Sequence, residues 1–409
     1  MQVVTTQQLA AVLSALPGVP RVVASGNCAL PRALLSVVDE SLPAYRLFVL
    51  NAHAGIPARP DVVHETAFVG PGMRHSPTLS YVPARLSLVP RLFATTLPPD
   101  VVCLNVSPAV DGAWSMGAEV NILPAAVAAC RARGGLVVVQ VNRHMPWTYG
   151  DGLLGEEVVD YVLEADEPLD EPKIPAPDEA SSRIGELVAA RIPDGATLQM
   201  GIGMVPDATL PGLRGRRDLA IWSEMFSDGV LTLEQAGALD DTKLVTSSFV
   251  IGSAELLSWV HRNPRVQVLR TEQTNAPSRI AANRSMTSIN TALQVDLFGQ
   301  ANASRINARI HSGFGGQTDF IVGALHSEGG QALMALRSWH PKADASSIVA
   351  MVDEPVTSFQ HTAVVTEQGV AEMFGHDERA QAAHLIEHAA HPRVREELWE
   401  EAAALGLAG

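Results

Sequence analysis

The residue best suited to covalent chemistry is a glutamate at the end of a short apolar run. In AIWSEMFSDG the run delivers Glu224, which is followed by Met225 and by a turn at Asp228 and Gly229. Burying an unpaired carboxylate is costly, so a carboxylate among apolar residues is either paired structurally or used as an acid, base or nucleophile. From this segment alone, a capping or ion-pairing glutamate remains an open alternative.

Two glycine-rich segments could bring backbone amides close to an anion or an oxyanion. The strand-like LQM runs into GIG at residues 201–203, but Pro206 stands where the dinucleotide-binding fingerprint needs its third glycine. The GFGG at residues 313–316 could aim several N–H groups at a developing oxyanion. Taken alone, each segment could equally be a plain turn.

Other catalytic patterns find little support. His384 and His388 are spaced to hold a metal on one helix face, but HExxH is absent and a charged helix follows, so we expect solvated surface and no metal site. No GxSxG elbow is present, and no Walker lysine follows a glycine loop. These absences disfavour serine hydrolases and P-loop enzymes.

Composition narrows the partners and the compartment. The formal net charge of -15 argues against a nucleic-acid partner, because nucleic-acid affinity comes largely from Lys and Arg. Three scattered cysteines predict neither a disulfide framework nor structural zinc, and they fit a reducing compartment. The start of the chain lacks signal-peptide character, and no apolar run approaches the ~18–20 residues of a membrane span. We therefore expect a cytoplasmic protein with no membrane partner.

The elements that must position these residues alternate between strands and helices. Continuous apolar runs such as VVCLNV and LVVVQV indicate parallel strands covered on both faces, and AEVNILPAAVAACRARG between them is a crossover helix. A stretch rich in proline and acidic residues, 165–182, breaks the pattern. The sequence thus predicts two open α/β domains with largely parallel sheets, at 1–178 and 179–409, with the active site in the interdomain cleft.

Taken together, the segments carry a family resemblance. The chain resembles the class I coenzyme A transferases, in the branch of 4-hydroxybutyrate and acetate CoA-transferases and the acetyl-CoA hydrolase/transferase family. The similarity follows the family's order through most of the chain. It is carried by FVGPGMRHS, YVPARLSLVPRLF, LNVSPAVDGAWSMG, QVNRHMPWTYGD, LQMGIGMVPDA, SEMFSDGVLTLEQAG, INTALQVDLFGQANA, SGFGGQTDF, VVTEQGVAEMFG and ERAQAAHLIEHAAHPRVREEL.

The resemblance implies a role for each of these segments. The family's nucleophilic glutamate corresponds to Glu224, and its GxGG loop corresponds to the oxyanion hole, with Gly315 and Gly316 as catalytic donors. Coenzyme A contacts are implied at the first glycine loop, in the segment that holds Ile289 and Asn290, and at the start of the GxGG loop. These contact residues are Gly201, Ile202, Gly203, Met204, Val205, Ile289, Asn290, Gly313 and Phe314.

The implied chemistry is ping-pong CoA transfer between carboxylic acids. Glu224 attacks an acyl-CoA, forming an acyl-glutamyl anhydride and then a glutamyl-CoA thioester, with no prosthetic group or metal. The partners would be an acyl-CoA, such as acetyl-CoA, and a carboxylate, such as 4-hydroxybutyrate. The resemblance also implies a homodimer or higher homo-oligomer. Alternatives are acyl-CoA hydrolysis, a catalytically silent acyl-CoA-binding protein and, more distantly, a dehydrogenase.

Three positions depart from the family pattern. Trp222 replaces a frequent histidine two residues before the glutamate, and Gln368 replaces a tyrosine in VVTEYG. Both positions are expected on segments near the acyl group, so they bear on the choice of substrate. Gln331 stands where relatives often carry a lysine, which indicates a lost contact to the CoA phosphates or one supplied by an arginine.

Overall fold

The computed structural model describes residues 1–172, 175–201, 203–356, 358 and 360–408, and these fall into two compact units. Unit 1 comprises Met1–Pro172, Leu244–Thr274 and Ile310–Gly315, and unit 2 comprises Lys173–Lys243, Asn275–Arg309 and Gly316–Gly409. The chain therefore returns to unit 1 twice after first leaving it. Whether 1–178 and 179–409 behave as separate domains stays a prediction.

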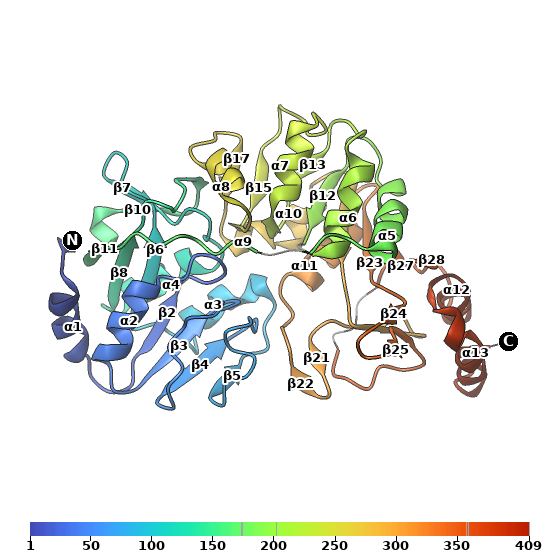
Figure 1. The fold of residues 1–409 in the computed structure, drawn as a ribbon, viewed down its shortest axis with the longest axis horizontal. Helices are drawn as coiled ribbons and strands as arrows, with labels where there is room; N and C mark the ends of the chain where they lie inside the picture. Colours follow the sequence, from blue (N-terminus) through green and yellow to red (C-terminus); the bar gives the residue numbers. More distant parts are fainter. Residues whose placement is uncertain (173–174, 202, 357, 359, 409) are drawn as a thin grey trace. The chain divides into compact units, whose positions relative to one another are not determined.

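Unit 1 is built on an eight-stranded sheet in which every neighbouring pair is parallel (Figure 1). The apolar runs VVCLNV and LVVVQV form neighbouring central strands, and every residue of the first is buried. Such burial on both faces explains the continuous apolar composition of these strands. In spatial order the strands are β1 (Gln2–Val3), β11 (Tyr161–Glu164), β8 (Leu136–Val141), β6 (Val101–Val106), β2 (Arg21–Ala24), β3 (Tyr45–Val49), β4 (Val62–Thr66) and β5 (Leu79–Tyr81).

The helices of unit 1 connect these strands. The helix predicted between the two apolar runs is α4, which packs against both of the strands that it joins. A smaller three-stranded sheet contains β15 (Val245–Ser247), β17 (Val266–Val268) and β9 (Tyr149–Gly150). The helices are α1 (Thr6–Ser14), α2 (Arg32–Ser41), α3 (Val89–Ala94), α4 (Leu123–Ala132), α8 (Ala254–Val260) and α9 (Thr271–Thr274).

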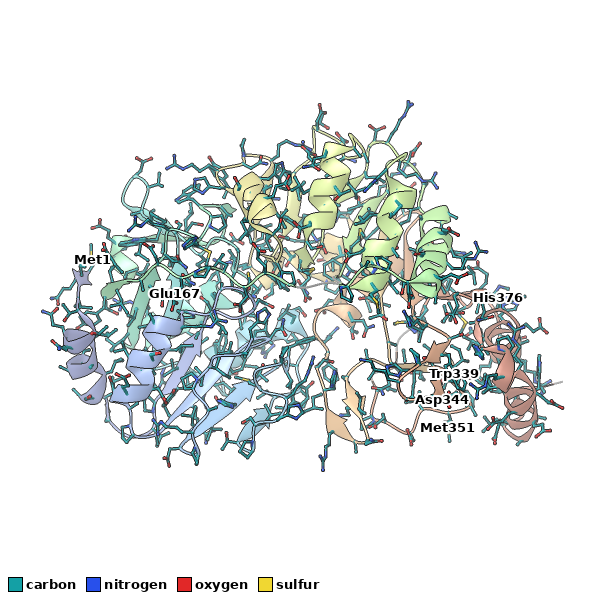
Figure 2. The ribbon with its side chains drawn as sticks, in the orientation of Figure 1. Met1, Glu167, Trp339, Asp344, Met351 and His376 are labelled. Carbon is teal, nitrogen blue, oxygen red and sulfur yellow. The ribbon has the colours of Figure 1, made fainter. Side chains whose placement is uncertain are left out.

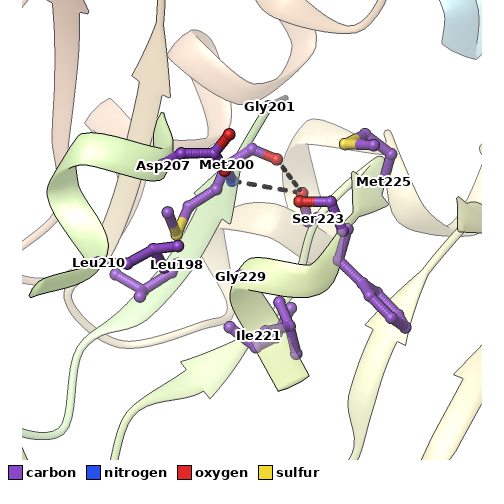
Figure 3. A pocket seen from close by; sticks show the side chains of 12 residues that line it. Leu198, Met200, Gly201, Asp207, Leu210, Ile221, Ser223, Met225 and Gly229 are labelled. Carbon is purple, nitrogen blue, oxygen red and sulfur yellow. Dashed lines mark hydrogen bonds between the residues drawn. The ribbon is translucent and has the colours of Figure 1, made fainter. Parts of the chain in front are cut away.

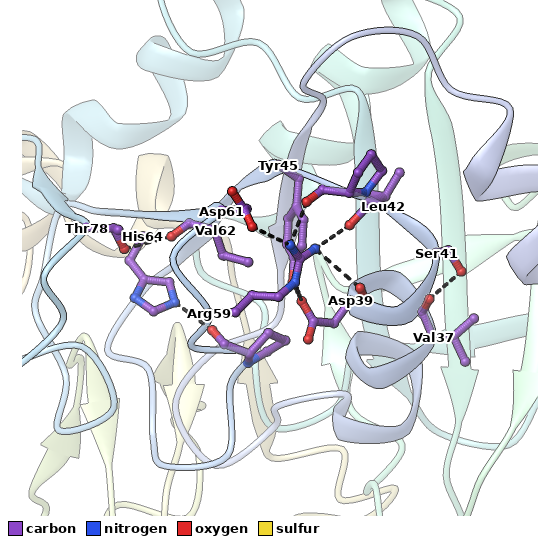
Figure 4. A network of polar contacts seen from close by, with 12 residues as sticks. Val37, Asp39, Ser41, Leu42, Tyr45, Arg59, Asp61, Val62, His64 and Thr78 are labelled. Carbon is purple, nitrogen blue, oxygen red and sulfur yellow. Dashed lines mark hydrogen bonds and ion pairs between the residues drawn. The ribbon is translucent and has the colours of Figure 1, made fainter.

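An arginine closes the carboxyl end of α2, as Figure 4 shows. The guanidinium of Arg59 donates to the carbonyl oxygens of Leu42 and Pro43 just beyond the helix, and its Nε donates to Asp39 Oδ1 at 2.8 Å. The hydroxyl of Tyr45 donates to the same carboxylate oxygen at 3.1 Å. Carbonyl groups at the end of a helix lack intrahelical partners, so this network satisfies them and anchors α2 against β3.

Unit 2 is built on a six-stranded sheet with only its last strand antiparallel. All the parallel strands end at one edge, which we call the carboxyl edge, and begin at the opposite one, the amino edge. The spatial order is β13 (Ala220–Ile221), β12 (Thr197–Met200), β18 (Met286–Asn290), β23 (Gln331–Ala335), β27 (Ala363–Thr366) and β28 (Gly369–Glu372).

The helices of unit 2 pack on this sheet and on one another. Helices α5 (Glu179–Ala190) and α6 (Met204–Leu213) lie side by side, and α11 (Gln317–His326) packs on β18 and β23 (Figure 1). A core that includes Val295, Phe320 and Val364 joins these strands to a small sheet of β20 (Ala301–Asn302), β19 (Gln294–Asp296) and β26 (Ile348–Val349). Further elements of unit 2 include α7 (Asp228–Gln235), α10 (Pro277–Ala281), α12 (Glu378–His384), α13 (Arg395–Ala404), β14 (Met225–Phe226), β24 (Trp339–His340) and β25 (Ala345–Ser346).

The predicted fold class is confirmed, because each unit is an α/β structure around a largely parallel sheet. Among the residues that the structure describes, no helix combines the length and the apolar character needed to span a bilayer.

Candidate functional site

Glu224 lies just beyond β13, at the carboxyl edge of the unit 2 sheet. The amide of Trp222 donates to the carbonyl oxygen of Leu198 in β12 at 3.1 Å. The hydroxyl of Ser223 lies 3.4 Å from the backbone nitrogen and 3.2 Å from the backbone oxygen of Met200, as Figure 3 shows. Ser223 is itself buried, so these contacts hold the segment that carries Glu224 against the end of β12.

The carboxylate of Glu224 is held by two hydrogen-bond donors. Asn275 Nδ2 donates to Oε2 at 2.8 Å, and the backbone amide of Gly316 donates to the same carboxylate. A β-carbon at position 316 would lie only 1.8 Å from Oε2 of Glu224 and 2.3 Å from Nδ2 of Asn275. Glycine is therefore required at position 316 for this close approach of the backbone.

The surroundings of Glu224 favour its neutral form. Burial is the largest cause that raises the pKa of Glu224, and the negative charge of Asp319, which is fully buried, raises it further. The two donors lower the pKa, and the net value is about 7. The residue retains partial solvent access, but its carboxylate is densely surrounded by protein. A carboxylate with this pKa is ionised in a substantial fraction of molecules at neutral pH, and it is poorly solvated, which makes it a stronger nucleophile than a carboxylate in water.

A cavity of about 10 Å³ adjoins the Glu224 segment and has room for about one water molecule (Figure 3). Its polar lining includes Ser223 and Asp207, and its apolar lining includes Met200 and Met225. Burial and, secondarily, the charge of Asp228 raise the pKa of Asp207. The cavity therefore lies between the end of β12 and the turn before α7, and it is too small for a substrate.

The predicted glycine loop at residues 201–205 follows β12 and leads into α6. Gly203 has φ +126°, a conformation that favours glycine, and a β-carbon there would meet no atom of the described residues within 4 Å. Met204 and Val205 form the first turn of α6 and are partly exposed. Ile202, also predicted to contact coenzyme A, lies outside the described residues.

The predicted segment at Ile289 and Asn290 ends β18, beside β12. Ile289 is buried, and its Cα is paired in register with that of Met200. Asn290 is partly exposed, and its Nδ2 donates to Ser288 Oγ at 2.7 Å. The ends of β13, β12 and β18 therefore bring three of the predicted segments to one edge of one sheet.

The predicted GxGG loop is divided between the two units. Gly313 and Gly315 belong to unit 1. A β-carbon at position 313 would lie 2.5 Å from the carbonyl oxygen of Ala67, and one at position 315 would lie 3.2 Å from the ring of Phe68. Phe314, between them, is partly buried. Gly316 belongs to unit 2 and precedes α11. Of this loop, Gly316 is the residue that the structure places directly against Glu224.

Two of the departures from the family pattern take part in hydrogen bonds in unit 2. Gln331 begins β23 at the amino edge, where its Nε2 donates to the carbonyl oxygen of Arg191 at 2.9 Å. Gln368 lies in the turn after β27, with its Nε2 3.2 Å from Glu367 Oε1. Trp222 is partly buried and packs against the unit 2 core. Gln331 thus stands at the edge opposite to Glu224.

Asn275 was not predicted from the sequence. It follows α9 and lies 51 residues from its partner Glu224 along the chain. No motif marks it, since the surrounding TEQTNAPS has the composition of an ordinary polar turn.

The two histidines that the sequence places on one helix face lie near the C-terminus. Nδ1 of His384 is 2.7 Å from the carbonyl oxygen of Glu372, and the ring of His384 contacts that of His388.

Known proteins resemble this chain over nearly its whole length. Residues 51–170 match the acetyl-CoA hydrolase/transferase N-terminal domain, and residues 252–402 match the C-terminal domain of the same family. The 4-hydroxybutyrate coenzyme A transferase of Clostridium kluyveri is 38% identical over 353 residues, which cover 83% of this chain and 81% of that protein.

Two solved structures share the fold of the whole chain. The 4-hydroxybutyrate CoA-transferase of Porphyromonas gingivalis is 32% identical, with a TM-score of 0.83. RipA from Yersinia pestis is 26% identical, with a TM-score of 0.91. Each comparison covers 99% of this chain and 98% of the other. The chain therefore belongs to the acetyl-CoA hydrolase/transferase family, and it is an enzyme of the CoA-transferase type.

Proposed function

We propose that this protein transfers coenzyme A between a short-chain acyl-CoA, such as acetyl-CoA, and a carboxylic acid, such as 4-hydroxybutyrate, with Glu224 as the nucleophile. The observation that carries this proposal is the desolvated Glu224 carboxylate, held by Asn275 and the amide of Gly316 at the carboxyl edge. The family membership and the similarity to 4-hydroxybutyrate CoA-transferases support the substrate class.

The reaction runs in two halves. A carboxylate oxygen of Glu224 attacks the thioester carbonyl of the donor, and collapse of the adduct expels the CoA thiolate and leaves an acyl-glutamyl anhydride. The thiolate then attacks the glutamyl carbonyl, giving a glutamyl-CoA thioester and the free acid of the donor. A second carboxylate reverses these steps and leaves as its CoA ester, so the kinetics are ping-pong.

The residues around Glu224 have separate tasks in this proposal. Gly201–Val205 and the end of β18, at Ile289 and Asn290, contact coenzyme A, and the partly exposed first turn of α6 supports that placement. The loop from Gly313 through Phe314 to Gly316 lies against the thioester, where amides of Gly315 and Gly316 stabilise the oxyanion. One such donor contributes about 3–4 kcal/mol in other enzymes.

The wider setting in this proposal is a cytoplasmic homodimer or higher homo-oligomer that uses no prosthetic group. The chain would be organised as domains 1–178 and 179–409. Coenzyme A is a substrate and a transient covalent adduct on Glu224. Nucleic acids and membranes are not among its proposed partners.

Acyl-CoA hydrolysis is the second candidate, because the family description covers hydrolases as well as transferases. In that reaction water, in place of a second carboxylate, resolves the covalent intermediate and releases free CoA thiol.

One assay tests the proposal and separates the two candidates. Purified protein is incubated with acetyl-CoA and a panel of short carboxylates, while new CoA esters and free CoA thiol are measured together. A transferase conserves total CoA ester when an acceptor is present, whereas a hydrolase loses it. The variant Glu224→Ala should lose turnover by several orders of magnitude, and turnover that survives in this variant would refute the role of Glu224.

A further inference from the structure

A second pocket of unit 2 lies at the amino edge of its sheet. It has a volume of about 350 Å³ and is lined by residues 298–300, 360–361, 373–375, 378 and 381. Residues 360–361 come shortly before β27, and 373–375 follow its antiparallel partner β28. Glu224 follows a parallel strand and so stands at the opposite edge. This amino-edge pocket is therefore separate from the proposed reaction site and is large enough for a small ligand.

The pocket is built by a loop that a buried carboxylate organises. Asp296 Oδ1 accepts hydrogen bonds from the amides of Phe298 at 3.0 Å and Gln300 at 2.8 Å. Gly299, at the tip of the loop, has φ +75°, and a β-carbon there would lie 3.1 Å from Cε of Met373. The loop and the end of β28 therefore form adjoining walls of a preformed pocket.

The walls of the pocket carry no positive charge at neutral pH. Among the described residues that line it there is no lysine or arginine, and its one histidine is His361. Burial lowers the pKa of His361 to about 4, although the nearby backbone of Gly299 acts in the opposite direction. Since CoA and carboxylates are anions, these walls do not suit the substrates of the proposed reaction.

The loop that forms one wall of the pocket carries a buried acceptor. Gln300 Oε1 is buried and has no partner within the described part of the chain, while its Nε2 lies 3.5 Å from the carbonyl oxygen of Phe298. A buried acceptor without a donor is costly, so a ligand that donates a hydrogen bond would favour a rotation of the Gln300 side chain that brings Oε1 into the pocket.

Helix α12 adds two further acceptors to the wall of the pocket. Gln381 Nε2 donates to the carbonyl oxygen of His376, which lies beside α12 in Figure 2. Its Oε1 would lie 3.6 Å from a β-carbon at position 299, so this oxygen approaches the tip of the loop. Glu378, also in the lining, contributes a carboxylate. The acceptors of the pocket therefore come from both the loop and the helix.

The mouth of the pocket is aromatic and open. Phe374 is 63% exposed, and Phe298 is partly buried. An aromatic face attracts a cation and also covers hydrocarbon. The pocket thus combines acceptors, one negative charge and aromatic surface.

We propose that the amino-edge pocket binds a small organic ammonium compound. Its ammonium group donates to the oxygens of Gln300, Gln381 and Glu378, and its hydrocarbon part covers the two phenylalanine rings. This site does not depend on the proposed CoA transfer, because it shares no residue with the Glu224 site.

The test compares n-butylammonium with 1-butanol, a neutral alcohol of the same chain length, on the full chain. Binding is followed by saturation-transfer NMR, and Phe374→Trp provides a fluorescent reporter at the mouth of the pocket. We expect saturable n-butylammonium binding in the millimolar range, weaker butanol binding, and a fluorescence change that tracks occupancy.

Two variants isolate the contacts. Glu378→Gln, at an exposed position, should weaken n-butylammonium binding about tenfold and leave butanol binding unchanged, because it removes a charge-assisted hydrogen bond. Gln300→Leu should also weaken the ammonium, while the exposed control Glu401→Gln in α13 should not. Equal binding of the two probes, absence of saturable binding, or equal effects of Glu378→Gln and Glu401→Gln would overturn the proposal.

Discussion

The raised pKa of Glu224 predicts that Glu224→Gln stabilises the protein at alkaline pH and leaves its stability unchanged in acid. The unperturbed pKa is 4.5 and the folded value is about 7. Between these values the folded chain holds a proton that the unfolded chain has released, so rising pH favours unfolding. Above about pH 7 both states are ionised, and the folded state bears the whole cost of the desolvated charge.

The size of the effect follows from the shift in pKa. At about 1.4 kcal/mol per pKa unit, a rise from 4.5 to about 7 corresponds to about 3–4 kcal/mol. Because the residue keeps partial access to water, we expect about 2–3 kcal/mol at pH 8. Glutamine retains an oxygen that accepts from Asn275 and Gly316, so the substitution mainly removes the charge.

The assay is urea unfolding of wild type and Glu224→Gln between pH 4 and pH 8, followed by tryptophan fluorescence. The difference in unfolding free energy should grow from near zero at acid pH to its full value above pH 7. The exposed control Glu401→Gln should give no such trend. A difference for Glu224→Gln that stays constant across this range would refute the claim that the carboxylate is desolvated in the folded protein.

Three further predictions follow from other contacts. Asn275→Ala removes a donor that stabilises the ionised carboxylate of Glu224, so kcat/KM should fall about tenfold or more. The pKa of Glu224 should rise, and the part of the pH–rate profile in which activity increases with pH should therefore move to higher pH. Gly316→Ala should abolish most turnover with circular dichroism unchanged, because its β-carbon would displace Glu224. The control Gly215→Ala should be tolerated, because a β-carbon there meets no atom within 4 Å in the described part of the chain. In unit 1, Glu119→Ala should lower the unfolding free energy by about 3 kcal/mol in urea titrations, since the buried Nδ2 groups of Asn27 and Asn121 both donate to this carboxylate.

Much of the fold was predictable because its signals are local. Runs such as VVCLNV are apolar at nearly every position, and strands buried on both faces favour that composition. The path of the chain between the units has no such signal. Leu244–Thr274 and Ile310–Gly315 join unit 1 through tertiary contacts, whereas a shift in composition marks only a linker such as 165–182.

The candidate site was predictable in part, for the same reason. Glu224 and Gly316 stand in recognisable segments, and the structure places them in contact. Asn275 bonds to Glu224 across 51 residues of sequence, and a single polar residue in a turn does not indicate such a partner. In the sequence, Gln331 stands where relatives often carry a lysine that binds the CoA phosphates. In the structure its side chain donates to the carbonyl oxygen of Arg191 at the amino edge, because Gln331 begins β23. The direction of β23 in the sheet decides this position, and no local signal gives it.

The most direct test of the account is to trap the covalent intermediate on Glu224. The protein is incubated with acetyl-CoA without an acceptor, reduced with borohydride, digested and mapped by mass spectrometry, with Glu224→Gln as the matched control. We expect reduction of a glutamyl thioester to an alcohol in the peptide that contains Glu224, and no change in the control. Modification at another residue, or an unmodified Glu224 peptide while transfer proceeds at full rate, would contradict the nucleophilic role of Glu224.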